Sequence, residues 1–214
     1  MKKQSFFIIF IMIIAIGIGL FRDHQEKIET HTAKLFTTST LNNATLLLPS
    51  KKLMAFEFMD MYGKPFTNNT LRDHWTFFFF GYTHCPDICP ITLGRLHQLA
   101  LRLKGIPSVQ FVFFSIDPEN DSPPQLQAFL KQDQFKGASF KGVTGNKSNI
   151  LSFAESLGIA VSREPGNQTI DHSGSLLLIN PRGECVAIFT STDKPHLIAH
   201  DVKEILHRHA NGQL

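Results

Sequence analysis

The chain has 214 residues, enough for one domain of ordinary size together with a tail or a membrane anchor. Hydrophobic residues make up 43% and charged residues 18%, which indicates a globular rather than a disordered protein. A formal charge of +3, without a long basic run interleaved with aromatic residues, argues against a nucleic-acid partner.

The first segment is predicted to be a membrane anchor. After MKKQ the chain reads SFFIIFIMIIAIGIGLF, which carries no charge and ends at Arg22. This run is longer than the apolar core of a cleaved signal, about 7–15 residues, and reaches the short end of a membrane span, about 17–25 residues. We therefore expect an uncleaved anchor over residues 1–22, with a removed signal peptide as the alternative. The two lysines favour a single-pass protein of the inner (cytoplasmic) membrane, with the soluble domain facing the periplasm.

The rest of the chain divides into a predicted linker, residues 23–50, and a predicted folded domain, residues 51–214. The linker mixes charged residues, Thr and Asn without a sustained period. In the domain, alternation or continuous apolar runs predict strands, and apolar residues at helical spacing predict helices. The expected elements are a short hairpin over 55–66, a buried strand over 74–83, a helix over 90–103, a second buried strand over 108–117, helices over 122–132 and 146–158, a hairpin over 173–190 and a final helix over 194–210.

This order predicts an α/β fold, a thioredoxin-like sheet with flanking helices and an antiparallel edge pair. In open sheets of this class the chemistry gathers beyond the carboxyl ends of the strands. Cys85 and Cys89 lie at such a place, between the first buried strand and the helix that follows it.

Cys85 and Cys89 are four residues apart in GYTHCPDICP, at the expected start of a helix. Residues at this spacing on a helix have Cβ atoms about 5–6 Å apart, so the two thiols can chelate one ion or, after adjustment, form a disulfide. The helix N-terminus is expected to lower a thiol's pKa, which favours metal binding and redox exchange alike. A purely structural disulfide explains the pair poorly, because so short a loop removes little unfolded-state entropy. Cys185 reads most simply as a buried packing residue.

A third ligand is expected to be His172, which stands just before a core strand in TIDHSGSLLLIN. In a thioredoxin-like fold the loop that enters this hairpin faces the cysteine-bearing turn. Two thiolates and one imidazole select copper or zinc over hard ions, and three ligands leave a coordination position open. Asp171 is expected to orient or tune the imidazole. His84 is expected to point away, and Asp117 to form a turn with the following proline.

The segments FGYTHCPDICP, SIDPENDSP and DHSGSLLLINPRGE, in this order and together with the N-terminal anchor, resemble the Sco/SenC family of membrane-anchored copper chaperones. The resemblance runs from about Phe56 to the final helix. It implies a thioredoxin-like domain in which Cys85, Cys89 and His172 bind Cu(I) and Cu(II). It also implies a role in assembling cytochrome c oxidase, by supplying the dinuclear copper centre of subunit II. The chain departs from the family pattern at Asn120, where an arginine is common.

The expected function is therefore that of a copper metallochaperone, a binding and delivery protein without turnover of its own. Its expected partner is cytochrome c oxidase subunit II or another copper-accepting protein. Two alternatives stay open at this point: a thiol-disulfide oxidoreductase that reduces the acceptor's cysteines, and a redox or copper sensor. His172 separates these functions, because a dithiol reductant needs no imidazole.

Overall fold

A computed structural model describes residues 41–214, apart from 107, 133–134, 136–138 and 164–168. The anchor expected over residues 1–22, and the expected linker up to residue 40, lie outside the described residues. Within the part of the chain that is described, no helix combines the length and apolar character needed to cross a bilayer.

The fold is built on an eight-stranded sheet with the order β1-β10-β9-β4-β5-β6-β2-β3, and β7 pairs separately with β8. The strands are β1 Thr45–Lys52, β2 Glu57–Asp60, β3 Pro65–Thr67, β4 Trp75–Gly81, β5 Val109–Ser115, β6 Phe140–Thr144, β7 Val161–Ser162, β8 Asp171–His172, β9 Ser175–Ile179 and β10 Glu184–Thr190. The helices are the 3-10 turn η1 Asn68–Leu71, α2 Ile88–Arg102, α3 Pro123–Leu130, α4 Lys147–Ser156 and α5 Pro195–Ala210.

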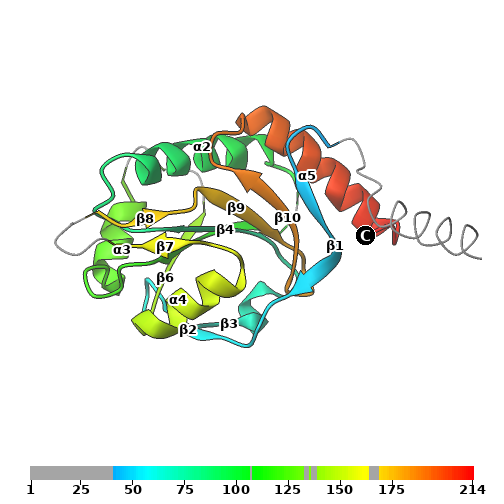
Figure 1. Cartoon of the computed structure of the whole chain (residues 1–214). Coiled ribbons are helices and arrows are strands. Elements are labelled where there is room, and N and C mark those ends of the chain that lie inside the picture. Colours follow the sequence, from blue (N-terminus) through cyan, green and yellow to red (C-terminus); the bar gives the residue numbers. More distant parts are fainter. Residues whose placement is uncertain (1–40, 107, 133–134, 136–138, 164–168) are drawn as a thin grey trace, which may run out of the picture. The chain divides into compact units, whose positions relative to one another are not determined.

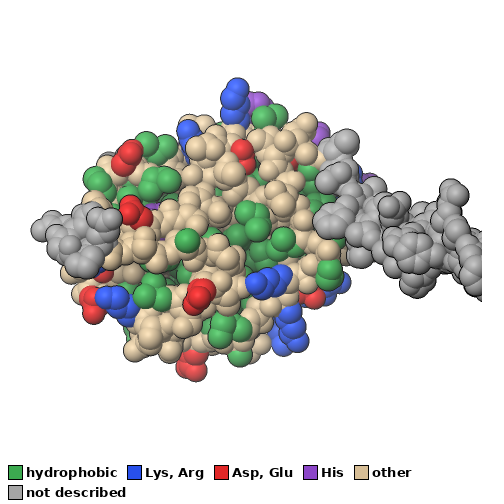
Figure 2. Space-filling model, viewed as in Figure 1, with side chains coloured by type: hydrophobic (Ala, Val, Ile, Leu, Met, Phe, Trp, Pro, Cys, Tyr) green, Lys and Arg blue, Asp and Glu red, His purple; other side chains and the backbone are tan. Residues whose placement is uncertain are grey.

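The helices cover both faces of the sheet. Figure 1 shows α2 and α5 along one face, where they pack on each other, and α4 on the opposite face. Strands β4, β5 and β6 run parallel, and β9 and β10 continue the sheet beyond β4 as an antiparallel pair. This pair was expected at the edge of the sheet, but β1 pairs with β10 and forms the edge. The expected α/β class and thioredoxin-like order are confirmed. On the side drawn in Figure 2, acidic and basic side chains are interspersed, with hydrophobic side chains between them.

The four consecutive phenylalanines of β4 form the centre of the core because successive strand residues point to opposite faces. Phe77 stacks on Phe111 of β5, with ring centroids 5.3 Å apart. Phe78 meets Phe114 edge-on at 4.8 Å, and Phe153 of α4 packs against Phe114 at 5.5 Å. A strand that is apolar on both faces is therefore explained by helices on both faces, as the sequence predicted.

Strand β6, Phe140–Thr144, was not predicted from the sequence. Its residues, FKGVT, neither alternate cleanly nor form an apolar run. Gly142 is in this strand because α3 packs directly over it: an added Cβ would lie 2.9 Å from Leu130 Cδ1 and 3.0 Å from Leu126 Cβ. The close helix contact thus favours a residue that weakens the strand pattern.

The described domain begins earlier than residue 51. β1 pairs antiparallel with β10, and the preceding backbone is held by Asp201 of α5, whose carboxylate is fully buried. This carboxylate accepts hydrogen bonds from the backbone N–H groups of Asn42 (3.2 Å), Asn43 (2.7 Å) and Ala44 (3.0 Å). Burial acts to raise the pKa of Asp201, but these donors outweigh it and the pKa is lowered. The expected linker therefore ends at a specific attachment point on α5.

We expect Asp201→Asn to lower the free energy of unfolding by about 1–3 kcal/mol, because backbone donors lose a charged acceptor. The lowered pKa gives the sign of the pH dependence: the stabilisation is complete above the pKa of an unfolded aspartate, about 3.9, and is lost as the pH falls through the lower folded-state value. Urea unfolding at neutral and acid pH measures both effects. Asp73→Asn, an exposed control, should change the free energy by less than about 0.5 kcal/mol; equal losses in the two variants would contradict this role.

Candidate metal centre

The two cysteines lie where β4 ends and α2 begins. Cys85 is in the turn after β4, Cys89 is in the first turn of α2, and both side chains are buried as free thiols. The backbone N–H of Cys89 donates to the Cys85 sulfur over 3.4 Å. Gly81, the last residue of β4, makes room for the second sulfur, because an added Cβ would lie 2.7 Å from Cys89 Sγ. The glycine lets the strand end closely against the thiol.

His172 lies beside this pair although it is far away in the sequence. It ends β8, and the next strand, β9, pairs with β4. Its Nε2 lies 3.6 Å from Cys89 Sγ, and the ligand atoms of Cys85, Cys89 and His172 are all within 4.8 Å of one another. Among the described residues, this is the one cluster of three or more potential metal ligands. The structure brings together the three residues expected to bind the metal.

A backbone carbonyl orients the imidazole of His172. Its Nδ1 lies 3.2 Å from the carbonyl oxygen of Ser173, which can only accept a hydrogen bond. Nδ1 therefore carries the proton in the neutral ring, and Nε2 presents its lone pair toward the sulfurs. The expected role of Asp171 as the group that orients the ring is thus filled by Ser173; Asp171 adds only its charge, which acts to raise the pKa of His172.

Burial controls the ionisation of the site. It raises the pKa of the Cys89 thiol far above its usual value, and it lowers the pKa of His172, so both groups are neutral at neutral pH. The lowered thiol pKa expected from the helix N-terminus is therefore wrong for Cys89. The reason is that loss of hydration outweighs the favourable end of the helix dipole for this buried sulfur.

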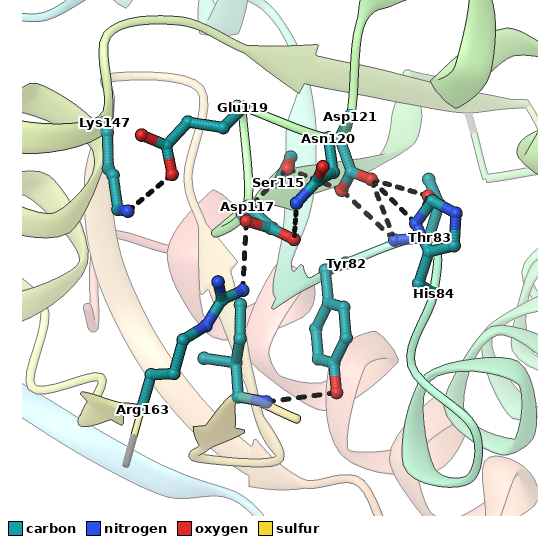
Figure 3. A network of polar contacts seen from close by, with 11 residues as sticks. Tyr82, Thr83, His84, Ser115, Asp117, Glu119, Asn120, Asp121, Lys147 and Arg163 are labelled. Carbon is teal, nitrogen blue, oxygen red and sulfur yellow. Dashed lines mark hydrogen bonds and ion pairs between the residues drawn. The ribbon is translucent and has the colours of Figure 1, made fainter. Parts of the chain in front are cut away.

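A buried carboxylate that the sequence interpretation missed holds the cysteine-bearing turn. Asp121 is fully buried and accepts hydrogen bonds from the Thr83 hydroxyl (2.5 Å), the Thr83 backbone N–H (3.1 Å) and the Ser115 hydroxyl (2.6 Å). Figure 3 shows this carboxylate between the turn and the end of β5. His84 points to the same carboxylate at 4.0 Å, with its side chain 68% exposed, and it is not one of the three clustered ligands.

Asp117 links the end of β5 to the residue that follows β7, and β7 pairs with β8, the strand that carries His172. Its carboxylate forms an ion pair with Arg163, just after β7, at 3.1 Å and accepts a hydrogen bond from Asn120 Nδ2 at 2.9 Å (Figure 3). The Asp117 backbone also forms the expected turn, because its carbonyl accepts from the backbone N–H of Asn120. Asn120, the position that departs from the family pattern, contacts the Asp117 carboxylate. The guanidinium that pairs with this carboxylate belongs to Arg163, in another part of the chain.

The donor set matches a soft metal ion. Two sulfurs and one imidazole nitrogen suit copper or zinc, whereas oxygen-preferring ions such as Mg²⁺ or Ca²⁺ have no carboxylate within the cluster. Three protein ligands leave one position for a ligand from another molecule. The same two thiols can also form a disulfide in an exchange reaction.

Comparison with known proteins agrees with this geometry. A family model described as SCO1/SenC matches residues 46–207. A Stutzerimonas stutzeri protein, provisionally named a copper-binding protein, is 35% identical over 144 residues, covering 64% of this chain and 69% of its own length. The copper-bound structure of ScoI from Bradyrhizobium japonicum aligns with a TM-score of 0.63 and 30% identity, covering 72% of this chain and 98% of that one.

A further structural relative bears on redox chemistry. BsSco, described as a member of the Sco family of cytochrome c oxidase assembly proteins with a disulfide switch, aligns with a TM-score of 0.63 and 27% identity, over 75% of this chain and 95% of its own. The chain spans 60% and 58% of the length of the mouse and human mitochondrial SCO2 homologues that it also matches.

We expect Cys89 in the metal-free protein to react slowly with iodoacetamide, with a rate that still rises above the pKa of an ordinary thiol, about 8.5. The reason is that burial raises its pKa, so little thiolate is present at neutral pH. Peptide mass spectrometry across a pH series measures the rate at Cys89 separately from the other thiols. The urea-unfolded protein is the control and should titrate as an ordinary cysteine; a plateau of the folded-state rate at or below that pH would contradict the assignment.

Proposed function

The chain belongs to the SCO1/SenC family, and we propose that it binds copper through Cys85, Cys89 and His172 and serves cytochrome c oxidase assembly. One observation carries the proposal: two sulfurs and an imidazole nitrogen lie within 4.8 Å of one another in a largely buried cluster. The fold around this cluster aligns with that of a copper-bound ScoI. Copper is thus the cargo that this donor set supports best.

We further propose that residues 1–22 anchor the protein in the inner membrane, with the domain in the periplasm. This proposal rests on the uncharged apolar run and on the two lysines that precede it. The acceptor proposed for the copper is the dinuclear centre of oxidase subunit II. A tethered domain keeps its metal site close to the membrane in which such an acceptor is assembled.

The geometry supports binding followed by transfer rather than permanent storage. Ser173 keeps Nε2 of His172 free to bind, so the imidazole need not lose a proton when copper arrives. Cys89 must release its proton, which couples copper binding to pH. The open coordination position admits a thiolate from an acceptor, and ligand exchange can then move the copper without releasing it into water.

A second function is favoured by the contact between the cysteines. The Cys89 backbone N–H donates to the Cys85 sulfur, and the two sulfurs lie within 4.8 Å of each other. In a reductant, both thiols lose their protons, a Cys85–Cys89 bond forms, and two electrons reduce a disulfide of the acceptor to two thiols. This chemistry needs no imidazole, so His172 distinguishes the two functions.

We expect His172→Ala to lose copper to a competing chelator that the parent protein resists, because two sulfurs remain where three ligands stood. Metal analysis after chelator challenge of the soluble domain from residue 41, in reducing buffer, measures the loss. His196→Ala, an exposed residue of α5, is the matched control and should keep copper as the parent does. Equal retention by His172→Ala and the parent would refute the three-ligand proposal.

Oxidation of the two thiols is expected to abolish Cu(I) binding, because a Cys85–Cys89 disulfide leaves no thiolate for the metal. A titration with Cu(I) before oxidation, after oxidation and after re-reduction measures the affinity. The Cys185→Ser variant should behave in the same way, since this thiol is buried in β10, outside the cluster. Unchanged Cu(I) affinity in the oxidised protein would show that the thiols are not the ligands.

A further inference from the structure

We propose that Tyr82 is a positioning residue for His172: it holds the strand that carries the imidazole against the turn that carries the cysteines. The proposal rests on the proposed copper function and deepens it, because it names the group that completes the site. Tyr82 directly follows β4, in the turn that leads to Cys85.

The aromatic ring of Tyr82 contacts the imidazole directly. Tyr82 is 3% exposed, and its ring lies edge-on to the His172 ring, with centroids 6.2 Å apart and an interplanar angle of 79°. Phe79 of β4 contacts the imidazole as well, at 6.1 Å. The two aromatic rings restrict the position of His172 from the β4 side.

The hydroxyl of Tyr82 makes the contact that fixes the backbone. It accepts a hydrogen bond from the N–H of Ile170 at 3.2 Å, drawn as the dashed line from the Tyr82 hydroxyl in Figure 3. Ile170 directly precedes β8. Ile170 is buried, so this N–H would have no water to replace the phenol oxygen. One side chain from the cysteine turn thus fixes the chain two residues before His172.

The Cys85 thiol also affects the Tyr82 hydroxyl: after burial, which is the largest cause, it acts to raise the pKa of Tyr82. The phenol oxygen that accepts from Ile170 keeps its own proton, so both interactions can exist together. An effect of Tyr82 on copper through Cys85 is therefore the rival to an effect through His172. The experiment must separate these two routes.

The ring contacts and the backbone hydrogen bond act on different parts of the tyrosine, so Tyr82→Phe tests the hydroxyl alone. The phenylalanine ring still fills the space beside His172 and leaves all three ligands in place. Without the hydroxyl, the Ile170 N–H loses its acceptor, and the segment leading into β8 is released from the turn. We expect the affinity for Cu(I) to fall about 10-fold, as is usual when a group that orients a ligand is removed.

The test combines this variant with His172→Ala in a double-mutant cycle, measured by competition for Cu(I) with a chelator of known affinity. If Tyr82 acts through His172, Tyr82→Phe weakens binding in the parent and has no effect once His172 is absent. An equal loss in both backgrounds would overturn the proposal, because the hydroxyl would then act through Cys85 or through stability. Tyr62→Phe removes the chain's other tyrosine hydroxyl from a side chain that is 55% exposed, and it should change nothing.

Electron paramagnetic resonance of the Cu(II) form gives a readout specific to the imidazole. Tyr82→Phe should add a species without nitrogen hyperfine coupling, whereas the parent and Tyr62→Phe should show one coupled species. Identical spectra for the parent and Tyr82→Phe would overturn the proposal. Failure of the parent to bind copper, or full binding by His172→Ala, would instead refute the proposed function, so the two failures are distinguishable.

A measurement on the unmodified protein covers the case in which Tyr82→Phe does not fold. The amide hydrogen of Ile170 should be protected from exchange in the metal-free domain, because it is bonded to the Tyr82 hydroxyl. Exchange at the rate of an unstructured peptide would contradict the proposal without any substitution.

Discussion

The antiparallel pairing of β9 with β4 is the interaction on which the site depends. Phe79 lies opposite Leu176, so the C-terminal end of β4 and the N-terminal end of β9 lie side by side. The first leads to the cysteines and the second comes from His172. A register slip of one residue would turn the core side chains of β9 to the other face, and burial of both faces resists such a slip.

The pairing brings the two segments together, and smaller contacts then fix them. Asp121 holds the turn before Cys85 through Thr83, and Asp117 reaches Arg163, just after β7, beside the segment that carries His172. These two carboxylates come from one short loop after β5, next to the strand from which the cysteine turn begins. The three residues proposed to bind the metal are therefore held by polar groups outside the cluster, which allows the cluster to keep its geometry while one coordination position stays open.

The sequence predicted the parts of this structure that local patterns encode and missed those that depend on contacts between distant segments. The apolar run of β4 and the cysteine spacing are local signals. His172 was expected from its place before a core strand, and the family resemblance supported that expectation. Strand β6 was missed because Gly142, which interrupts its sequence pattern, is required by the close packing of α3 and not by its neighbours in the strand. The attachment of residues 42–44 to Asp201 has no local signature either, because its partners lie more than 150 residues apart. The lowered pKa expected for Cys89 was wrong because the sequence places this thiol at the start of a helix but does not show how deeply it is buried.

Burial also limits the charge that the occupied site can hold. Two thiolates in a largely buried cluster are costly on their own, since an isolated charge loses its hydration there. A divalent ion balances two thiolates, whereas a monovalent ion leaves one negative charge, toward which the Cys89 N–H and the start of α2 are favourably oriented. Asp121 opposes that charge, because its carboxylate acts to raise the pKa of Cys89. In the proposed copper site, charge balance would favour Cu(II), and the soft sulfur atoms and the helix end would favour Cu(I).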